Sequence, residues 1–221
     1  MKHSMRIHRV RLGAEEYRVL RPDRPARGGY LHDRWSAEMY ADREASRQLV
    51  AAWGLAVRSP RSLVYVPMRG NSAPQGVPQE AAPLDLVLVH HRLQFPVSRW
   101  KAVRARLGTG QPHTVKLPES VFKDGPARPC PFHGTDATRR DHLLFDRAAD
   151  TLFVIGSTTA FRATAATLHA LVAEETALLR DDENHHFCVE LSSGPWHRRR
   201  TRGRVSAGLH IEYRAERAAA A

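Results

Sequence analysis

The stretch Leu84–Phe95, LDLVLVHHRLQF, decides the fold. Its unbroken apolar run, Leu86–Val89, lacks the polar alternation of a half-exposed strand and is typical of a strand buried on both faces. Pro96 ends the strand because proline has no backbone N–H to donate to a sheet. The sequence therefore predicts a buried strand here, with the other elements arranged around it.

On the N-terminal side, alternation of polar and apolar residues over Met5–Leu20 predicts two short strands around Gly13. A helix is expected next, with Asp33 as its N-cap and Gly54 as its C-terminal stop. Ser62–Met68 is predicted to be a strand. The apolar and small residues that recur near helical spacing in the expected helix are Trp35, Met39, Ser46, Leu49 and Trp53.

On the C-terminal side, Ser98 is expected to cap a short helix over Arg99–Leu107. A strand pair, a helix capped by Ser157 or Thr158, and two final strands follow. The sequence shows no strong internal repeat, but a strand pair followed by a helix occurs at both ends, an order compatible with two similarly built halves. The expected strand pair covers Leu143–Asp146 and Thr151–Ile155, and the helix covers Thr159–Arg180. The two final strands cover His186–Leu191 and Leu209–Tyr213. The pattern predicts an α+β fold, a mostly antiparallel sheet with two or three packed helices.

Two stretches rich in proline and glycine, Arg69–Pro83 and Asp124–Thr138, are predicted to be loops. The first divides the chain into an N-terminal hairpin, helix and strand (1–68), a loop (69–83) and a C-terminal α+β segment (84–221). We expect these segments to form one compact unit.

The charge balance is strongly basic. Lys and Arg number 34 against 23 Asp and Glu, a net charge of +11, and 30 of the 34 are arginines. The preference for arginine over lysine is typical of a GC-rich genome, whereas the excess of positive charge is not explained by it. A net charge of this size gives a positive potential over much of the surface, which favours nucleic acid, anionic lipid or an acidic protein as partner.

Length and hydropathy exclude other classes. A chain of 221 residues with only two cysteines buries enough surface to need no disulfide framework. The longest nearly apolar stretch, Leu49–Val57, is far shorter than the ~20 residues of a membrane span, and Met1–Gly13 has no signal-peptide core. We expect a cytoplasmic protein without a membrane partner; the sequence does not indicate an oligomeric state.

The segment Trp196–Arg204, WHRRRTRGR, lies between the two final strands. If those strands pair, its arginines project from one loop beside a tryptophan that can stack on a base, an arrangement suited to phosphate and nucleic acid. A solvated loop in an arginine-rich protein is the alternative. The predicted contacts are Trp196, Arg198, Arg199, Arg200, Arg202 and Arg204, assisted by Arg99, Lys101, Arg104 and Arg106 on the short helix.

The two cysteines give a second candidate site. Cys130 with His133 and His185 with Cys188 have the close ligand spacing of a zinc site within each pair. The pairs are separated by the 51 residues between His133 and His185, and Cys188 falls on an expected strand, so a buried structural thiol is the alternative. No cofactor is predicted outright; zinc is the metal this set would bind.

The histidines give a third candidate. The chain has two histidine doublets, His90-His91 and His185-His186. Neighbouring residues on a strand face opposite sides, so at most one ring of each doublet can enter a shared site. Histidines with arginine and a carboxylate can cleave RNA by proton transfer, although locally bonded histidines are the commoner case. The candidates are His90 or His91, His186, Glu190 and Arg92. The chain has no phosphate-binding loop, G-x-S-x-G, H-E-x-x-H or G-x-G-x-x-G motif, so no catalytic residue is predicted.

The runs TLFVIGSTTAFRATAATLHALVAEE (151–175), HHFCVEL (185–191) and SAGLHIEYR (206–214) resemble a small bacterial immunity-protein family encoded beside polymorphic toxins. The resemblance covers about Leu143–Arg214 and implies a non-enzymatic module that blocks a toxin's active site. This chain departs from it by the arginine-rich insertion and by the residues in front of Leu143. No functional residue is carried over.

These observations predict a non-catalytic nucleic-acid-binding protein that holds phosphates through the arginine-rich loop. A protein-binding module of the immunity type, with an acidic protein partner, is the second hypothesis. A metal-dependent or histidine-based nuclease is the third.

Overall fold

The computed structural model describes residues 2–33, 36–78, 80–123, 142–173, 187–193 and 208–214. The first part holds β1 (Lys2–Leu12), β2 (Glu15–Pro22), β3 (Gly29–Asp33), β4 (Ala37–Ala41), α1 (Arg43–Arg58), β5 (Ser62–Val66) and β6 (Ala82–His90). The middle holds α2 (Trp100–Ala105), β7 (Gln111–Lys116) and α3 (Ser120–Lys123). The last part holds β8 (Leu144–Arg147), β9 (Thr151–Gly156), α4 (Thr158–Ala173), β10 (Cys188–Ser192) and β11 (Gly208–Tyr213).

The described strands form one 11-stranded mixed sheet in which most pairs are antiparallel, which confirms the α+β prediction. The main path runs β10-β11-β4-β3-β6-β5-β2-β1-β7, and β9 adds to β6 with β8 beside it. The sheet branches at β6 because Asp85–His90 pair with β9 while Ala82–Leu84 pair with β3.

Strand β6 is buried on both faces, as its apolar run predicts. Leu86 and Leu88 belong to the hydrophobic core that contains α1 and α4. Val87 and Val89 belong to a second core on the opposite face, where Trp100 of α2 packs. Period-two alternation along one strand thus divides a continuous apolar run between two cores.

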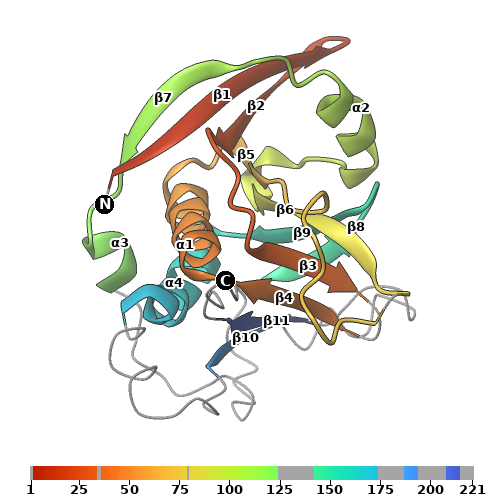
Figure 1. Ribbon diagram of the computed structural model, residues 1–221. Coiled ribbons are helices and arrows are strands. Elements are labelled where there is room, and N and C mark those ends of the chain that lie inside the picture. The colour runs from red at the N-terminus through yellow and green to blue at the C-terminus, as the bar shows by residue number, and fades with distance from the viewer. Residues whose placement is uncertain are drawn as a thin grey trace.

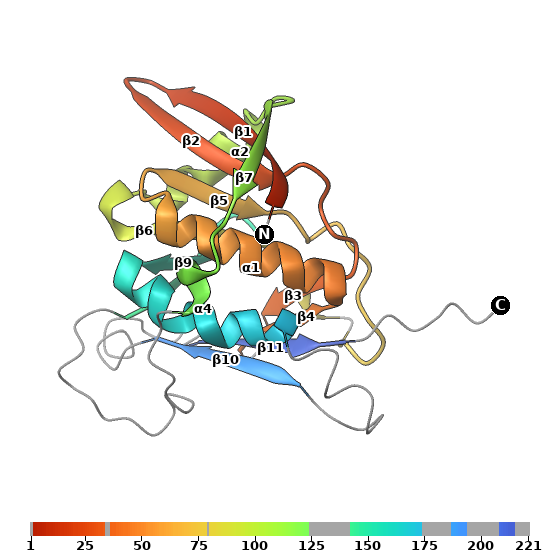
Figure 2. The same ribbon diagram turned by 90° about the vertical axis from the view of Figure 1, so that its left-hand side faces the viewer.

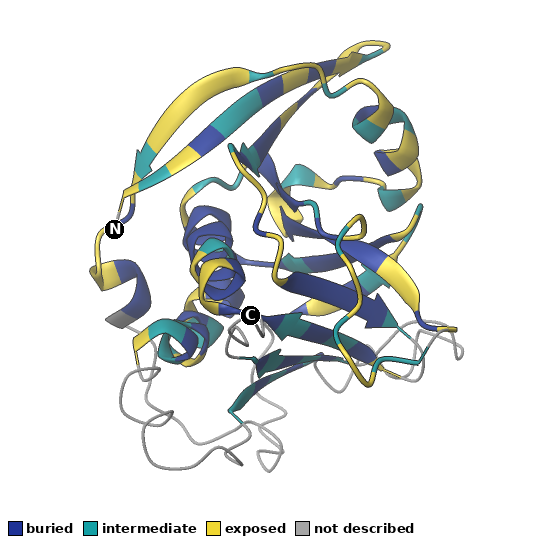
Figure 3. Ribbon diagram, in the orientation of Figure 1, coloured by how far each residue is buried: buried dark blue, intermediate teal, exposed yellow. Residues whose placement is uncertain are grey.

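The sheet curves around α1 and α4, which lie side by side in its hollow, with β1, β2 and β7 above them and β10 and β11 below (Figures 1 and 2). Short helix α2 covers the other face near β5. Dark blue in Figure 3 marks the buried residues, which follow α1 and the inner strands, whereas β7 at the sheet edge is exposed along most of its length. The two helices therefore contribute the larger core, and α2 closes the smaller one.

The predicted hairpin at the N-terminus is present: β1 and β2 pair in antiparallel register from Met5 opposite Pro22 to Leu12 opposite Glu15. Gly13 turns the chain with a φ of 63°, a left-handed value that glycine adopts without steric cost. Strand β7, which pairs with the other edge of β1, was not expected from its sequence.

The prediction that a helix begins at Asp33 is wrong. Residues 29–33 and 37–41 form the antiparallel pair β3 and β4, and Met39 lies on the buried face of β4. Asp42 is the actual N-cap, and its carboxylate accepts a 2.7 Å hydrogen bond from the Ala45 N–H. The helical spacing of Met39 with Ser46 was therefore coincidental.

Gly54 does not stop the helix, because α1 continues to Arg58. It lies where the helix meets the segment after β7: a Cβ added there would stand 2.8 Å from Leu117 Cδ1 and 3.0 Å from Phe122. The neighbouring side chains thus leave little room for a side chain at position 54.

Ser98 does not cap α2 either. A short 3₁₀ turn over Val97–Arg99 precedes the helix, and Arg99 occupies the N-cap position without a side-chain hydrogen bond.

Two stretches of the described chain, called the two halves below, have the same order of elements. Each has two strands, a helix and two more strands: β3-β4-α1-β5-β6 in the first half and β8-β9-α4-β10-β11 in the second. In each half one capping residue separates the second strand from the helix, Asp42 in the first and Ser157 in the second. The halves exchange pairings reciprocally, since β4 pairs in parallel with β11 and β9 pairs in parallel with β6.

The segments on either side of 69–83 belong to the same sheet, since β5 pairs with β6 and β6 pairs with β3. None of the helices among the described residues has the length and hydropathy to cross a bilayer.

Candidate functional site

The outer face of β3, β4, β11 and β10 carries a row of ionisable side chains across the strands. The register places His32 opposite Glu38, Glu38 beside His210, and His210 opposite Glu190. Imidazole and carboxylate therefore alternate across the four strands. The intervening residues, including Met39 and Ile211, point to the other face and into the core around α1 and α4.

Two histidine–carboxylate contacts lie along this row. His32 Nε2 lies 3.5 Å from Glu38 Oε2, and His210 Nδ1 contacts Glu190 Oε1 directly. His32 is buried, and this burial lowers its pKa, while Glu38 and Asp33 act in the opposite direction. The row thus holds one buried imidazole at its β3 end and a half-buried histidine–carboxylate pair at its β10 end.

The adjacent row on the same face contains Tyr30, Tyr40, Glu212 and Cys188. The guanidinium of Arg214 lies 4.2 Å from the centre of the Tyr40 ring, a cation–π distance, and its Nε donates a 2.9 Å hydrogen bond to Glu212. This row therefore binds the chain after β11 to β4.

Cys188, Glu190 and His210 could hold a metal ion: one ligand atom from each lies within 4.8 Å of the other two. This is the one group of three metal-ligating side chains found in the described part of the chain. The sequence predicted Cys188 as a ligand, but with Cys130, His133 and His185, which lie outside the described residues. His210 was missed because only the strand register brings it to the other two.

The prediction for the arginine-rich loop depended on the pairing of the two final strands, and these strands do pair. β10 and β11 are antiparallel, from Cys188 opposite Glu212 to Ser192 opposite Gly208. Residues 193–207 therefore connect two paired strand ends. The predicted contacts Trp196, Arg198, Arg199, Arg200, Arg202 and Arg204 all lie outside the described residues.

The cations of α2 lie at the opposite end of the molecule from β10 and β11 (Figure 1). Arg104 is largely buried and donates to Asp85 and to the Thr151 hydroxyl. Arg99 donates to Glu15 and to the Tyr17 hydroxyl. Lys101 is exposed, and Arg106, also exposed, donates to the Ala102 carbonyl. Two of the four cations thus contact side chains of other elements, Arg106 bonds only within its own helix, and none adjoins the final hairpin.

His90, the first histidine of the doublet at the end of β6, is engaged at both ring nitrogens. His90 Nε2 lies 3.1 Å from the Thr158 hydroxyl at the start of α4, and its Nδ1 accepts from the Arg92 N–H. Glu190 contacts His210 instead, and His186 lies outside the described residues. The described members of the predicted nuclease set are therefore not brought together.

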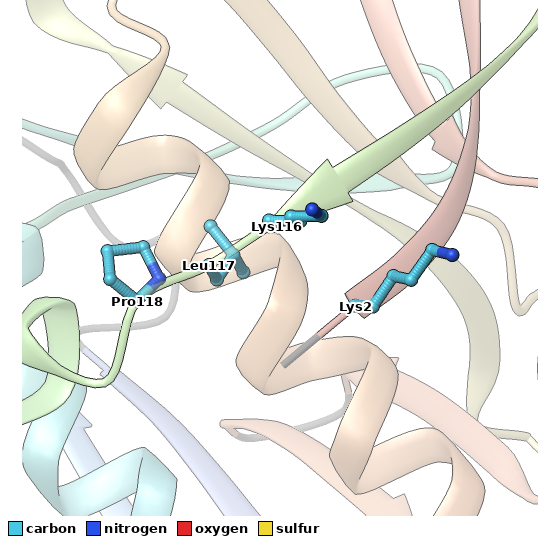
Figure 4. Close-up of a pocket in the computed structure, with 4 residues that line it drawn as sticks. All are labelled: Lys2, Lys116, Leu117 and Pro118. Atoms are coloured by element: carbon cyan, nitrogen blue, oxygen red, sulfur yellow. The ribbon is translucent and has the colours of Figure 1, made fainter.

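A pocket of about 530 Å³ opens beside the N-terminus of β1 (Figure 4). Its lining pairs two ammonium groups, Lys2 and Lys116, with the apolar side chains of Leu117 and Pro118. Lys2 and Lys116 face each other in the β1–β7 register, so this edge of the sheet carries concentrated positive charge. Neither lysine was singled out from the sequence.

Buried histidines predict that the protein loses stability in acid. Burial lowers the pKa of His8, His32 and His90. The positive charge of Arg21 lowers the pKa of His8 further. Below about pH 6.5 these histidines bind protons in the unfolded chain while they stay neutral in the folded protein. The free energy of unfolding should therefore have its full value above about pH 6.5 and decrease as the pH falls below it. Urea unfolding between about pH 5 and pH 8 measures this slope.

His8→Gln should reduce the slope, and His113→Gln serves as the control because that ring is exposed on neighbouring β7. A free energy of unfolding that stays constant across this range would contradict the prediction.

Comparison of the chain with family models, curated proteins and solved structures found no match. The resemblance of residues 143–214 to toxin immunity proteins therefore stays a prediction.

Proposed function

We propose that the protein binds nucleic acid through the connection between β10 and β11, without catalysis. The observation that carries this proposal is the antiparallel pairing of Cys188–Ser192 with Gly208–Tyr213, which makes residues 193–207 a hairpin connection. Five arginines and Trp196 fall within that connection.

The corresponding connection in the first half, between β5 and β6, supports a function for the arginines of residues 193–207. Residues 67–81 join β5 to β6 and are also 15 in number, yet they contain one arginine, Arg69, and one glutamate. Arg69 is engaged with Asp85 and Asp150. Arginine-rich composition alone would enrich both connections, so the concentration of charge in 193–207 favours a function for it.

The chemistry of the segment suits a polyanion. Guanidinium groups bind phosphate oxygens with two parallel hydrogen bonds, and an indole ring can stack on a base. Neither interaction selects a base sequence, so we expect binding governed by phosphate contacts and by salt. The proposal rests on the hairpin alone, since α2 lies at the other end of the molecule.

Replacing all five hairpin arginines, Arg198, Arg199, Arg200, Arg202 and Arg204, by serine should weaken binding and flatten its salt dependence. Each lost phosphate contact reduces the slope of log K against log salt by about 0.7–0.9, so the five together should reduce it by roughly 3–5. The measurement is titration of labelled RNA and DNA, single-stranded and duplex, between about 50 and 200 mM salt.

A charge-matched variant separates a hairpin site from general attraction. It replaces five exposed cations elsewhere in the described chain by serine: Arg18, Arg24, Arg27, Arg61 and Arg92. Its binding should stay close to that of the unaltered protein. Equal losses in the two variants, or no binding at the low-salt end, would overturn the proposal, and the second result would direct attention to an acidic protein partner.

A further inference from the structure

We propose that Cys188, Glu190 and His210 bind a zinc ion on the outer face of the β10–β11 pair. A thiolate, a carboxylate and an imidazole are the three donor types that zinc takes in proteins. Their ligand atoms lie within 4.8 Å of one another. Of these three ligands, only Cys188 also belongs to the zinc site predicted from the cysteine spacing; Glu190 and His210 do not.

The strand register holds the three side chains on one face. Cys188 and Glu190 are two residues apart on β10 and so project to the same side, and His210 stands directly opposite Glu190 on β11. Ligand atoms around a tetrahedral zinc ion lie about 3.3–3.7 Å apart, given bond lengths of about 2.0–2.3 Å. To hold the ion, the more distant ligand atoms would have to approach one another and the direct contact between His210 and Glu190 would have to open.

Charge and surroundings also suit a divalent cation. The thiolate and carboxylate together carry two negative charges, which a neutral imidazole leaves unchanged. Glu38 is the register neighbour of His210 on β4, so a further carboxylate lies on the strand beside the site. Glu212 faces Cys188 across the strand pair and accepts a hydrogen bond from Arg214.

The ligands sit at the base of the arginine-rich connection. Glu190 and His210 are each two residues from the last register pair, Ser192 and Gly208, from which residues 193–207 depart. A bound ion would cross-link the edge strand β10 to β11, and because the unfolded chain cannot present this geometry, binding would stabilise the fold. The site needs no nucleic acid, so its test is independent of the proposed function.

The experiment is titration of the full chain, stripped of metal with a chelator, with Co²⁺ alone and then with Zn²⁺. We expect one equivalent of Co²⁺ to bind with a near-ultraviolet thiolate-to-cobalt absorption band, Zn²⁺ to displace it, and the thermal unfolding midpoint to rise with metal concentration. Absence of Co²⁺ binding at millimolar concentration would overturn the proposal.

The two cysteines of the chain give a matched pair of variants. Cys188→Ser should abolish the absorption band and weaken Zn²⁺ binding by about 100-fold or more, since loss of an outer partner alone costs about 10–100-fold. Cys130→Ser should bind as the unaltered protein does. Equal loss in both variants would contradict the assigned ligands and support the set that includes Cys130 and His133.

His210→Gln is a second ligand variant, and it should weaken binding while keeping the thiolate band at high Co²⁺. Circular dichroism of each metal-free variant checks that the fold persists. A His210→Gln protein with unchanged Zn²⁺ affinity would overturn the assignment of His210.

Discussion

Asp85→Ala should lower the free energy of unfolding by about 3–5 kcal/mol, the cost of breaking a buried ion pair by removing one partner. Asp85 lies on β6 with only 1% of its surface exposed, on the face that meets α2. Denaturant unfolding followed by circular dichroism measures the loss.

The expected effect is large because one carboxylate satisfies several donors at once. Its Oδ1 accepts from the backbone N–H groups of Met68 and Arg69, at 2.9 and 3.1 Å. Its Oδ2 accepts from the Tyr65 hydroxyl at 3.0 Å and from Arg104 at 3.2 Å. Alanine would remove the acceptor of the two backbone N–H groups and of the Tyr65 hydroxyl in a low-dielectric interior, and would deprive Arg104 of its buried counter-charge.

Tyr65 depends on the same carboxylate. Burial, together with the negative charge and hydrogen bond of Asp85, raises the pKa of the Tyr65 phenol, which therefore stays protonated and donates.

Asp150→Asn provides the control. Asp150 contacts the same two arginines, Arg69 and Arg104, but its side chain is 63% exposed. We expect a change within about 1 kcal/mol there, as for exposed ion pairs generally. Comparable losses of unfolding free energy for Asp85→Ala and Asp150→Asn would show that the stabilisation by Asp85 does not depend on its burial.

The elements that the sequence predicts well are those whose apolar period is unambiguous. The β6 run, the β1–β2 hairpin and the order of elements from β8 to β11 follow from period and turn residues alone. The partner of each strand did not follow, because pairing β4 with β11 or β9 with β6 joins residues more than 60 positions apart.

The misplaced start of α1 has a local cause. Trp35, Met39 and Ser46 happen to recur near helical spacing, so Asp33 resembled an N-cap, whereas Asp42 with Glu44 in the first turn was the true signal. Strand β7 was missed for the opposite reason: QPHTVK is an exposed edge strand with little apolar alternation.

The candidate metal site shows a limit of reasoning from spacing. Cys188 and Glu190 are visible in the sequence as a pair on one face of a strand, but His210 joins them only through the β10–β11 register. A long connection separates the two strands, and its length does not determine which residues face each other.

Trp53→Ala should also lower the free energy of unfolding by about 3–5 kcal/mol, the usual cost of truncating a buried tryptophan. Trp53 of α1 is fully buried, and its indole N–H donates to the Phe161 carbonyl and the Thr164 hydroxyl of α4. The side chain thus joins the helices of the two halves by packing and by hydrogen bonding. Trp53→Phe should lose less, because the ring packing largely remains.

A double-mutant cycle tests whether this residue couples the two halves. The Trp53 and Phe161 rings meet edge to face, with centroids 5.3 Å apart, so Trp53→Ala and Phe161→Leu should deviate from additivity by about 0.5–1.5 kcal/mol. Trp100 is equally buried but belongs to the core on the other side of the sheet, so Trp100→Phe combined with Phe161→Leu should be additive. Additivity in the first cycle would mean that α1 and α4 stabilise the sheet separately, and that the interface between the halves does not depend on this contact.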